Sequence, residues 1–306
     1  MPEKVTGRYL SANKKTKVSY YVWAPKKPRA IIQIAHGMCE YVERYAPHAE
    51  FFCSQGFVFA GNDHLGHGKT AECENELGYT YGADFMVDDL ATLTDILKGR
   101  YPGLPVILLG HSMGSFLLRE YMTKYSSKLT GAILSGTAGP DSPTSLGGML
   151  ASLIGKLKGD HYRSPLLFML SIGAYSKPFG KDEEAECWLP RDKAVTKAYR
   201  EDKFCHFVFT ANGYVSLFDV LGRVSKKNWA GKLDKSLPIL LLSGADDPVG
   251  GFGKGVKKVH ERIKRTGVKD LSLVLIDGAR HEPLNELEPA KSEAYKTVCD
   301  WINERI

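Results

Sequence analysis

The sequence predicts an α/β protein in which helices cover both faces of a mostly parallel sheet. Two observations favour this class. Short apolar runs alternate with helical patterns along most of the chain. Several of these runs, residues 239–242 most clearly, are apolar at every position, which is typical of strands buried on both faces. With 306 residues, 43% of them apolar, the chain has enough material for a full core.

The predicted strands and helices follow in order along the chain. Residues 85–97 carry apolar side chains at helical spacing, and residues 290–306 close the chain with a second such pattern. The runs that predict strands are residues 18–23, 30–35, 57–61, 106–109, 131–134, 239–242 and 271–276.

The alternation stops after Gly139-Pro140 and resumes near residues 237–238. The segment between them is mostly helical in pattern and ends near Val224. Because a structureless loop of about 85 residues is improbable in a compact domain, we predict a helical cap. The predicted organisation is a first part of the core (residues 1–138), a cap (139–224) and a second part of the core (225–306).

The first helix of the cap carries an unbroken apolar stripe at helical spacing. We expect this stripe to pack on the core. The alternative is that part of it lines a hydrophobic pocket for an acyl chain, or makes transient contact with a membrane surface. A second apolar segment, residues 166–175, makes the cap more apolar than its packing requires. The stripe consists of Leu146, Met149, Leu150, Leu153, Ile154 and Leu157.

Composition excludes several classes of protein. The net charge of +6 comes from 41 basic and 35 acidic residues that are mixed along the chain, so we expect no nucleic-acid partner. The charged N-terminus does not resemble a signal peptide, and no run is long and apolar enough for a membrane span. The cysteines lack metal-binding spacing and suit six reduced thiols, so we expect a cytoplasmic protein. No oligomeric state is predicted.

A serine stands at a predicted corner between a strand and a helix. The apolar run 105–109 leads into Gly110-His111-Ser112-Met113-Gly114, and a helical pattern follows. A sharp turn that projects a serine hydroxyl toward a histidine makes it a nucleophile, and Gly110 and Gly114 leave the space that such a turn needs. We therefore predict that Ser112 is a nucleophile.

A nucleophilic serine needs a base and an acid that orients the base. His281 follows the strand-like run 271–276, and in a parallel sheet such loops meet at the edge where Ser112 lies. We expect His281 to be the base. Asp246 and Asp247 follow the run 239–242, and the residues alone do not choose between them as the acid.

The oxyanion of an acyl-transfer reaction needs two backbone N–H donors. One should be the amide of Met113, at the start of a helix. The second should be the amide of Met38, in the loop after the run 30–35, where Gly37 would let the chain bend. We expect His36, beside them, to be structural.

Two further patterns suggest cofactors and are set aside. Asp63-His64-x-x-His67 could hold a metal, but a tight turn through Gly66 and Gly68 is the better interpretation. Residues 250–255 are glycine-rich but lack the Gly-Lys-Ser/Thr ending of a phosphate loop. Neither a metal nor a cofactor is predicted.

Five motifs in order resemble the monoacylglycerol lipase and lysophospholipase group of the α/β-hydrolases, also called serine aminopeptidase S33-like hydrolases. The resemblance covers nearly the whole chain. It departs at Cys39, where a small residue is usual, and at Leu65, where arginine is frequent. The motifs are His36-Gly37-Met38-x-Glu40 with Arg44-Tyr45, Asp63-x-x-Gly66-His67-Gly68, Gly110-His111-Ser112-Met113-Gly114, Gly244-x-x-Asp247 and His281-Glu282.

The resemblance implies an α/β-hydrolase fold with a helical cap inserted after the sixth strand. It selects Asp247 as the acid, and it implies an oxyanion hole formed by Met38 and Met113. The implied activity is hydrolysis of a small ester with an acyl chain, such as a monoacylglycerol or a lysophospholipid. The alternatives are an amide or peptide hydrolase, or an acyltransferase, that uses the same triad.

Overall fold

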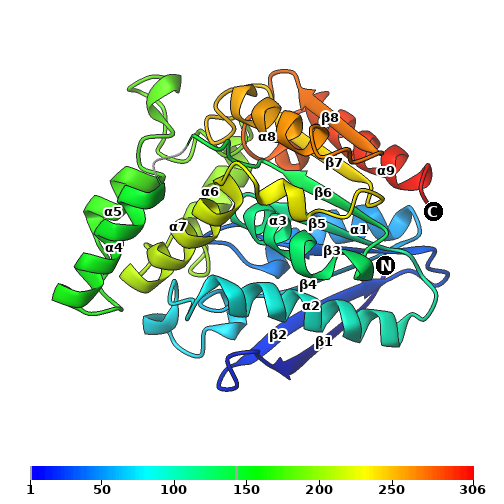
Figure 1. Ribbon diagram of the computed structural model, residues 1–306, viewed down its shortest axis with the longest axis horizontal. Helices are drawn as coiled ribbons and strands as arrows, with labels where there is room; N and C mark the ends of the chain where they lie inside the picture. Colours follow the sequence, from blue (N-terminus) through cyan, green and yellow to red (C-terminus); the bar gives the residue numbers. More distant parts are fainter. Residues whose placement is uncertain (1, 142–143) are drawn as a thin grey trace.

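The structure is a computed structural model that describes residues 2–141 and 144–306, and it confirms the predicted fold class. Eight strands of these residues form one mostly parallel sheet between layers of helices (Figure 1). The order is β1-β2-β4-β3-β5-β6-β7-β8, and only the β1–β2 and β2–β4 pairs are antiparallel among the described strands. The strands are β1 (Glu3–Leu10), β2 (Lys17–Ala24), β3 (Ala30–Ala35), β4 (Phe57–Asn62), β5 (Val106–His111), β6 (Gly131–Ser135), β7 (Ile239–Gly244) and β8 (Leu271–Ile276).

Helices cover both faces of the sheet, which explains why the central strands are apolar at every position. On β5, Ile107 and Leu109 pack with α1 and α9, whereas Leu108 packs with α2, α3 and α8 on the opposite face. The helices are α1 (Ala46–Ser54), α2 (Ala83–Arg100), α3 (Met113–Tyr125), α4 (Thr144–Lys158), α5 (Pro165–Ser171), α6 (Lys193–Glu201), α7 (Ala211–Ser225), α8 (Lys254–Lys264) and α9 (Ala290–Asn303).

The sequence patterns do not predict β1. This strand is at the edge of the sheet and pairs only with β2. Its residues are exposed or half-buried in alternation, and three of them are charged. An edge strand is held by backbone hydrogen bonds and needs no apolar run, so its sequence resembles a charged terminus.

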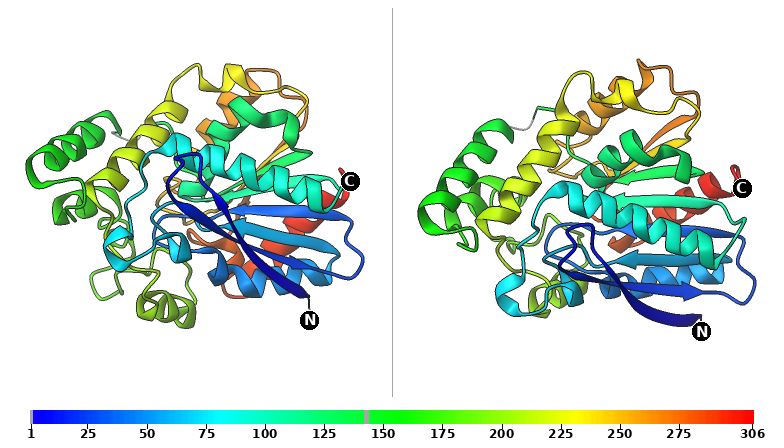
Figure 2. Two further views of the ribbon diagram at one scale, coloured as in Figure 1. Left: turned by 90° about the horizontal axis from the view of Figure 1, so that it is seen from below. Right: turned by 60° about the horizontal axis from the view of Figure 1, so that its bottom comes forward.

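Four α-helices of the described residues, α4 to α7, lie between β6 and β7, where the cap is predicted. The two views of Figure 2 show α4 and α5 at one end of the molecule, away from the sheet. Residues 142–143 of the predicted cap lie outside the described residues. Within the described ranges, each helix is too short or too polar to cross a lipid bilayer.

The expectation that the apolar stripe of α4 packs on the core is wrong for most of its residues. Leu150 and Ile154 are half-buried and pack against the core. Leu146, Met149, Leu153 and Leu157 are between 53% and 73% exposed. The reason is the position of α4 in the outer layer, where it contacts α7 and α5, so its outer face is left uncovered.

Candidate active site

Ser112 lies at a strained turn between β5 and α3. Its φ of 52° and ψ of −119° fall in a region that side-chain-bearing residues rarely adopt. A Cβ on Gly110 would lie 2.4 Å from the carbonyl oxygen of Gly114, and a Cβ on Gly114 would lie 1.9 Å from that of Ala35. The predicted sharp turn is therefore present, and the two glycines are required by lack of room.

His281 and Asp247 form a buried pair at the same edge of the sheet. The Nδ1 atom of His281 lies 3.1 and 3.0 Å from the two carboxylate oxygens of Asp247. Asp247 also accepts hydrogen bonds from the Val249 amide at 2.8 Å and the Ser243 hydroxyl at 3.2 Å. Asp246 is exposed, so only Asp247 of the two aspartates holds the imidazole.

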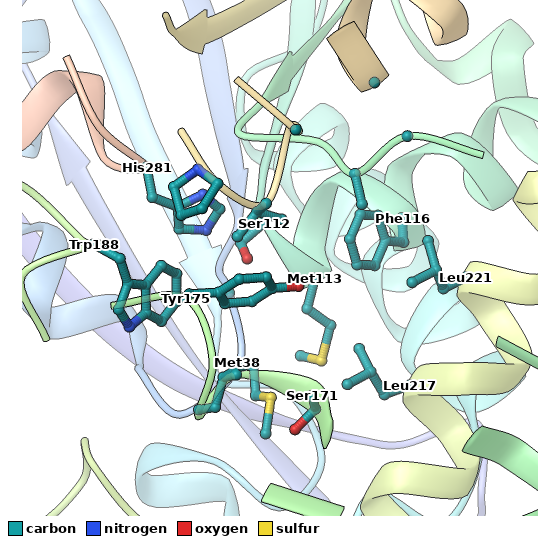
Figure 3. Close-up of a pocket in the computed structure, with 18 of the residues that line it drawn as sticks. Met38, Ser112, Met113, Phe116, Ser171, Tyr175, Trp188, Leu217, Leu221 and His281 are labelled. Carbon is teal, nitrogen blue, oxygen red and sulfur yellow. The ribbon is translucent and has the colours of Figure 1, made fainter. Parts of the chain in front are cut away.

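The pair leaves the Nε2 atom of His281 free toward the cavity that contains Ser112. Because Nδ1 is bound to a carboxylate, the proton of a neutral imidazole lies on Nδ1 and Nε2 is an acceptor. Nε2 is buried and has no hydrogen-bond partner among the described residues. Ser112 lines the same cavity, and Figure 3 shows it beside His281, although no hydrogen bond joins them here. Such bonds often tighten only when substrate binds.

Two backbone amides next to Ser112 are available to a ligand. Met38 and Met113 both line the cavity, and neither amide donates a hydrogen bond to another described residue. Gly37 was predicted to let this loop bend, but its φ is not in the left-handed region. The left-handed residue is Cys39, with a φ of 57°. A Cβ at position 37 would lie 2.7 Å from a carboxylate oxygen of Glu40 and 3.2 Å from the Cβ of Ser112, so a larger residue would have to displace the Glu40 carboxylate.

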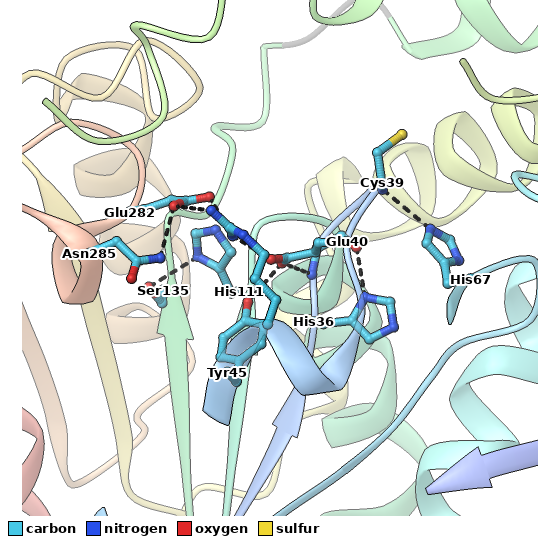
Figure 4. Close-up of polar contacts among 11 residues, drawn as sticks. His36, Cys39, Glu40, Tyr45, His67, His111, Ser135, Glu282 and Asn285 are labelled. Carbon is cyan, nitrogen blue, oxygen red and sulfur yellow. Dashed lines mark hydrogen bonds and ion pairs between the residues drawn. The ribbon is translucent and has the colours of Figure 1, made fainter. Parts of the chain in front are cut away.

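A buried ionic cluster joins the loop after β3 to the loop after β8 (Figure 4). Arg44 donates to both carboxylate oxygens of Glu282, at 2.9 and 2.8 Å, and to Glu40 at 2.8 Å. Glu40 also accepts hydrogen bonds from the Tyr45 hydroxyl at 2.7 Å and from the Gly37 amide. The Arg44 side chain is 13% exposed and both carboxylates are less exposed, so solvent screens these charges weakly.

The charges around His281 raise the pKa of its imidazole above the ordinary value. Burial by itself lowers this pKa, but the carboxylates of Asp247, Glu282 and Glu40 stabilise the charged form and outweigh burial. The ring of His111 lies 4.9 Å from that of His281. Burial, together with the nearby His281, lowers the pKa of His111 to about 4. His281 is therefore the histidine of this pair that is suited to take up a proton.

The cavity over Ser112 has a volume of about 840 Å³ and is mostly apolar (Figure 3). Helix α3 and the segment between β6 and β7, which is the predicted cap, both contribute to its walls. Tyr175 of the cap points its hydroxyl into the cavity, and burial together with the charge of Asp247 raises the pKa of this hydroxyl to about 12. Apolar wall residues include Phe116, Leu146, Leu150, Leu170, Leu217 and Leu221.

The cap is also bound to the loop that carries His281. The backbone amide of His281 donates to the carbonyl oxygen of Trp188 at 3.2 Å, and that of Glu282 donates to Leu189 at 3.4 Å. The indole of Trp188 lies 5.1 Å from the imidazole of His281. The sequence offers His281 as a candidate but gives no sign of its partners Trp188 and Leu189, because no local pattern marks a pairing over such a separation.

The segment from His64 to Gly68, which was set aside as a metal site, forms the predicted tight turn. His36 accepts a hydrogen bond from the His64 amide at 3.0 Å, and its ring lies 4.1 Å from that of His64. Gly66 and Gly68 have φ values of 73° and 47°, as a tight turn requires. The Cys39 thiol is buried, which raises its pKa, so it is not a reactive thiolate.

This chain is similar in sequence and structure to known proteins. A family model described as serine aminopeptidase, S33, matches residues 26–288. A monoacylglycerol lipase from Mycolicibacterium smegmatis is 27% identical over 292 residues, which are 94% of this chain and 92% of that protein. A human monoglyceride lipase is 26% identical over 92% of this chain and 86% of its own length. The crystal structure of a thermostable carboxyl esterase from Bacillus coagulans in complex with glycerol superposes with a TM-score of 0.92. It is 28% identical and is matched over 100% of this chain and 99% of that one.

The different environments of the two aspartates predict different effects of substitution. Asp247→Asn removes the negative charge that fixes the Nδ1–H tautomer of His281, so we expect turnover of a soluble ester to fall by about 10⁴-fold. Asp246→Asn changes an exposed side chain, and we expect turnover within about threefold of the original protein. Steady-state kinetics measure both, with circular dichroism as a check on folding. Greater damage from Asp246→Asn would show that the assignment is wrong.

The charge cluster predicts a change in pH dependence. A general base acts in its neutral form, so kcat/KM rises as pH increases through the pKa of His281. Glu282→Gln removes a carboxylate that raises this pKa, so we expect the rise to move to lower pH. The pH profile of kcat/KM measures the shift, and Asp246→Asn serves as an exposed-carboxylate control. An unchanged profile, or a shift to higher pH, would contradict the role of Glu282.

Proposed function

This chain belongs to the serine aminopeptidase S33 family of hydrolases, and we propose that it cleaves carboxylic esters through an acyl-enzyme on Ser112. One observation carries the proposal. A strained serine shares a cavity with the free Nε2 atom of a histidine whose other nitrogen is bound to a buried aspartate. The free amides of Met38 and Met113 support it.

In the proposed mechanism, the Ser112 hydroxyl oxygen attacks the ester carbonyl carbon while its proton moves to His281 Nε2. The imidazolium that results is stabilised by Asp247. The oxyanion accepts hydrogen bonds from the Met38 and Met113 amides, each contributing about 3 kcal/mol of transition-state stabilisation. His281 then gives the proton to the leaving alcohol. Water repeats the cycle on the acyl-enzyme and releases the acid, and no metal or cofactor takes part.

We propose lipid-like monoesters, such as a monoacylglycerol or a lysophospholipid, as substrates. A cavity of about 840 Å³ is large enough for an acyl chain, and its wall is predominantly aliphatic and aromatic. The lipases among the relatives act on substrates of this class, as their names say. The division of the chain into core (residues 1–138 and 225–306) and cap (139–224) remains our proposal. The six free cysteines support a cytoplasmic location.

The test of this function starts with the nucleophile. A fluorophosphonate probe should label the original protein and fail to label the Ser112→Ala variant. The variant should also lose about a millionfold in turnover, since removal of a triad serine has effects of this size. Ester hydrolysis that survives in Ser112→Ala would refute the mechanism.

The second test concerns the substrate class and uses the original protein with p-nitrophenyl esters of increasing chain length. We expect kcat/KM for p-nitrophenyl esters to increase from acetyl to chains of eight or more carbons, by roughly tenfold for every two methylenes buried. An optimum at acetyl would contradict an acyl-binding cavity. Aminoacyl anilides in the same assay test the alternative of amide hydrolysis, and added alcohols test acyl transfer.

We also propose that the cap contacts lipid surfaces through its exposed apolar face. Leu146 and Leu170 belong both to this face and to the cavity wall, so the face is continuous with the site. Continuity would let a lipid pass from a bilayer or micelle into the cavity without crossing water. The exposed cap face consists of Leu146, Met149, Leu153, Leu157, Leu166, Met169 and Leu170.

Substitutions on this face should weaken binding to lipid. We expect the double variant Leu153→Ser/Leu157→Ser to bind phosphatidylcholine vesicles at least tenfold more weakly, because two largely exposed leucines no longer insert. Hydrolysis of a soluble butyrate ester should not change. Leu10→Ser is the matched control, since Leu10 is 59% exposed and belongs to the edge strand β1 instead of the cap. Equal vesicle binding by all three proteins, measured by flotation, would rule out this contact.

A further inference from the structure

Arg119 of α3 is a buried cation without a carboxylate partner among residues 2–141 and 144–306. Its side chain is 0% exposed, and its hydrogen bonds go to two backbone carbonyl oxygens. Its Nε atom has no partner among the described residues. Because an unpaired charge is costly to place in a protein interior, this position needs a specific explanation.

The guanidinium joins the two ends of the cap. One terminal nitrogen of Arg119 donates to the carbonyl oxygen of Ala138 at 3.2 Å, where the chain leaves β6 for the cap. The other donates to the carbonyl oxygen of Val224, in the last turn of α7, where the chain returns to the core. A guanidinium is planar and rigid, so it holds two acceptors at a fixed separation. The ring of Trp229 lies 4.5 Å from the guanidinium carbon and packs over the fork.

Both segments that Arg119 binds form walls of the cavity. Ala138 lines the cavity directly. Helix α7 lines it through Leu217 and Leu221, which Figure 3 shows across the cavity from Trp188. Phe116, one turn before Arg119 on α3, completes this side of the wall. The spacing of the two carbonyls therefore determines the position of α7 relative to α3 and Ser112.

A second arginine shows which part of this arrangement is particular to Arg119. Arg262 of α8 also donates to carbonyl oxygens at the end of α7, those of Ser225 and Lys226. Both arginines donate to carbonyls at a helix C-terminus, where intrahelical partners are lacking. The hydrogen bonds of Arg262 in this region reach only the segment that leaves the cap, whereas Arg119 bridges both segments.

We propose that Arg119 is a positioning residue that fixes the cap over Ser112 and thereby sets the preference for long acyl chains. This inference rests on the proposed ester hydrolase function. A short acyl group needs only the part of the cavity next to Ser112. A long chain also needs the distal walls, whose positions depend on the bridge between Ala138 and Val224.

The experiment measures the ratio of kcat/KM for p-nitrophenyl laurate to kcat/KM for p-nitrophenyl butyrate. This ratio is compared between the original protein and its variants. Arg119→Met keeps the length of the side chain and removes both hydrogen bonds. We expect this ratio to fall about tenfold, mainly through a higher KM for laurate, which corresponds to one hydrogen bond to a charged group. Arg119→Lys, whose ammonium does not span both carbonyls, should lower the ratio by a smaller factor. Arg262→Met, the matched control, should leave it within about twofold.

Hydrogen–deuterium exchange gives a readout independent of catalysis. We expect faster exchange in residues 211–225 of Arg119→Lys, with no change in the strands. An unchanged ratio in Arg119→Lys, an equal loss on both esters, or an equal fall of the ratio in Arg262→Met would each overturn the proposal. If Arg119→Met does not fold, Arg119→Lys decides by the same criteria. Butyrate hydrolysis and fluorophosphonate labelling of the original protein report on Ser112 alone. They therefore distinguish failure of the ester mechanism from failure of the proposal on Arg119.

Discussion

The close approach of α3 to β3 is the constraint on which the rest of the site depends. The carbonyl oxygen of Ala35 lies where a side chain at position 114 would be, so only glycine fits at that position. Because β3 and β5 are adjacent, with Ala35 opposite Gly110, the turn that holds Ser112 meets the loop that holds Met38. The strain at Ser112 is retained because the surrounding sheet and helix leave no alternative path.

The arrangement of a parallel sheet explains why much of the site could be predicted from the sequence. Ser112, Asp247 and His281 each follow a recognisable apolar strand, and such strands end at one edge of the sheet. Local physics did not separate Asp246 from Asp247, because adjacent residues in a loop differ only in where they point. Burial of Asp247 against His281 is a property of the folded chain, and the family resemblance was needed to anticipate it.

Features that depend on contacts between distant segments could not be predicted. The apolar stripe of α4 shows that one face of the helix is apolar, but it does not show what covers that face. Arg44 belongs to a motif, yet its bridge between Glu40 and Glu282 exists only because two loops meet after folding. Arg119 lies in a helical pattern with no mark that separates it from a surface arginine. The edge strand β1 needs no apolar run, because backbone hydrogen bonds to β2 hold it in the sheet.

The hydrogen bonds from the loop of His281 to Trp188 and Leu189 have a consequence for protein engineering. A cap exchanged whole between two relatives would replace the backbone segment that supports the histidine loop, and a loss of activity would say little about substrate preference. Exchange of α4 and α5 alone would leave that support in place, because both helices end before residue 188. Chimaeras cut at these boundaries would exchange the walls that α4 and α5 contribute to the cavity and would keep the backbone support of the His281 loop.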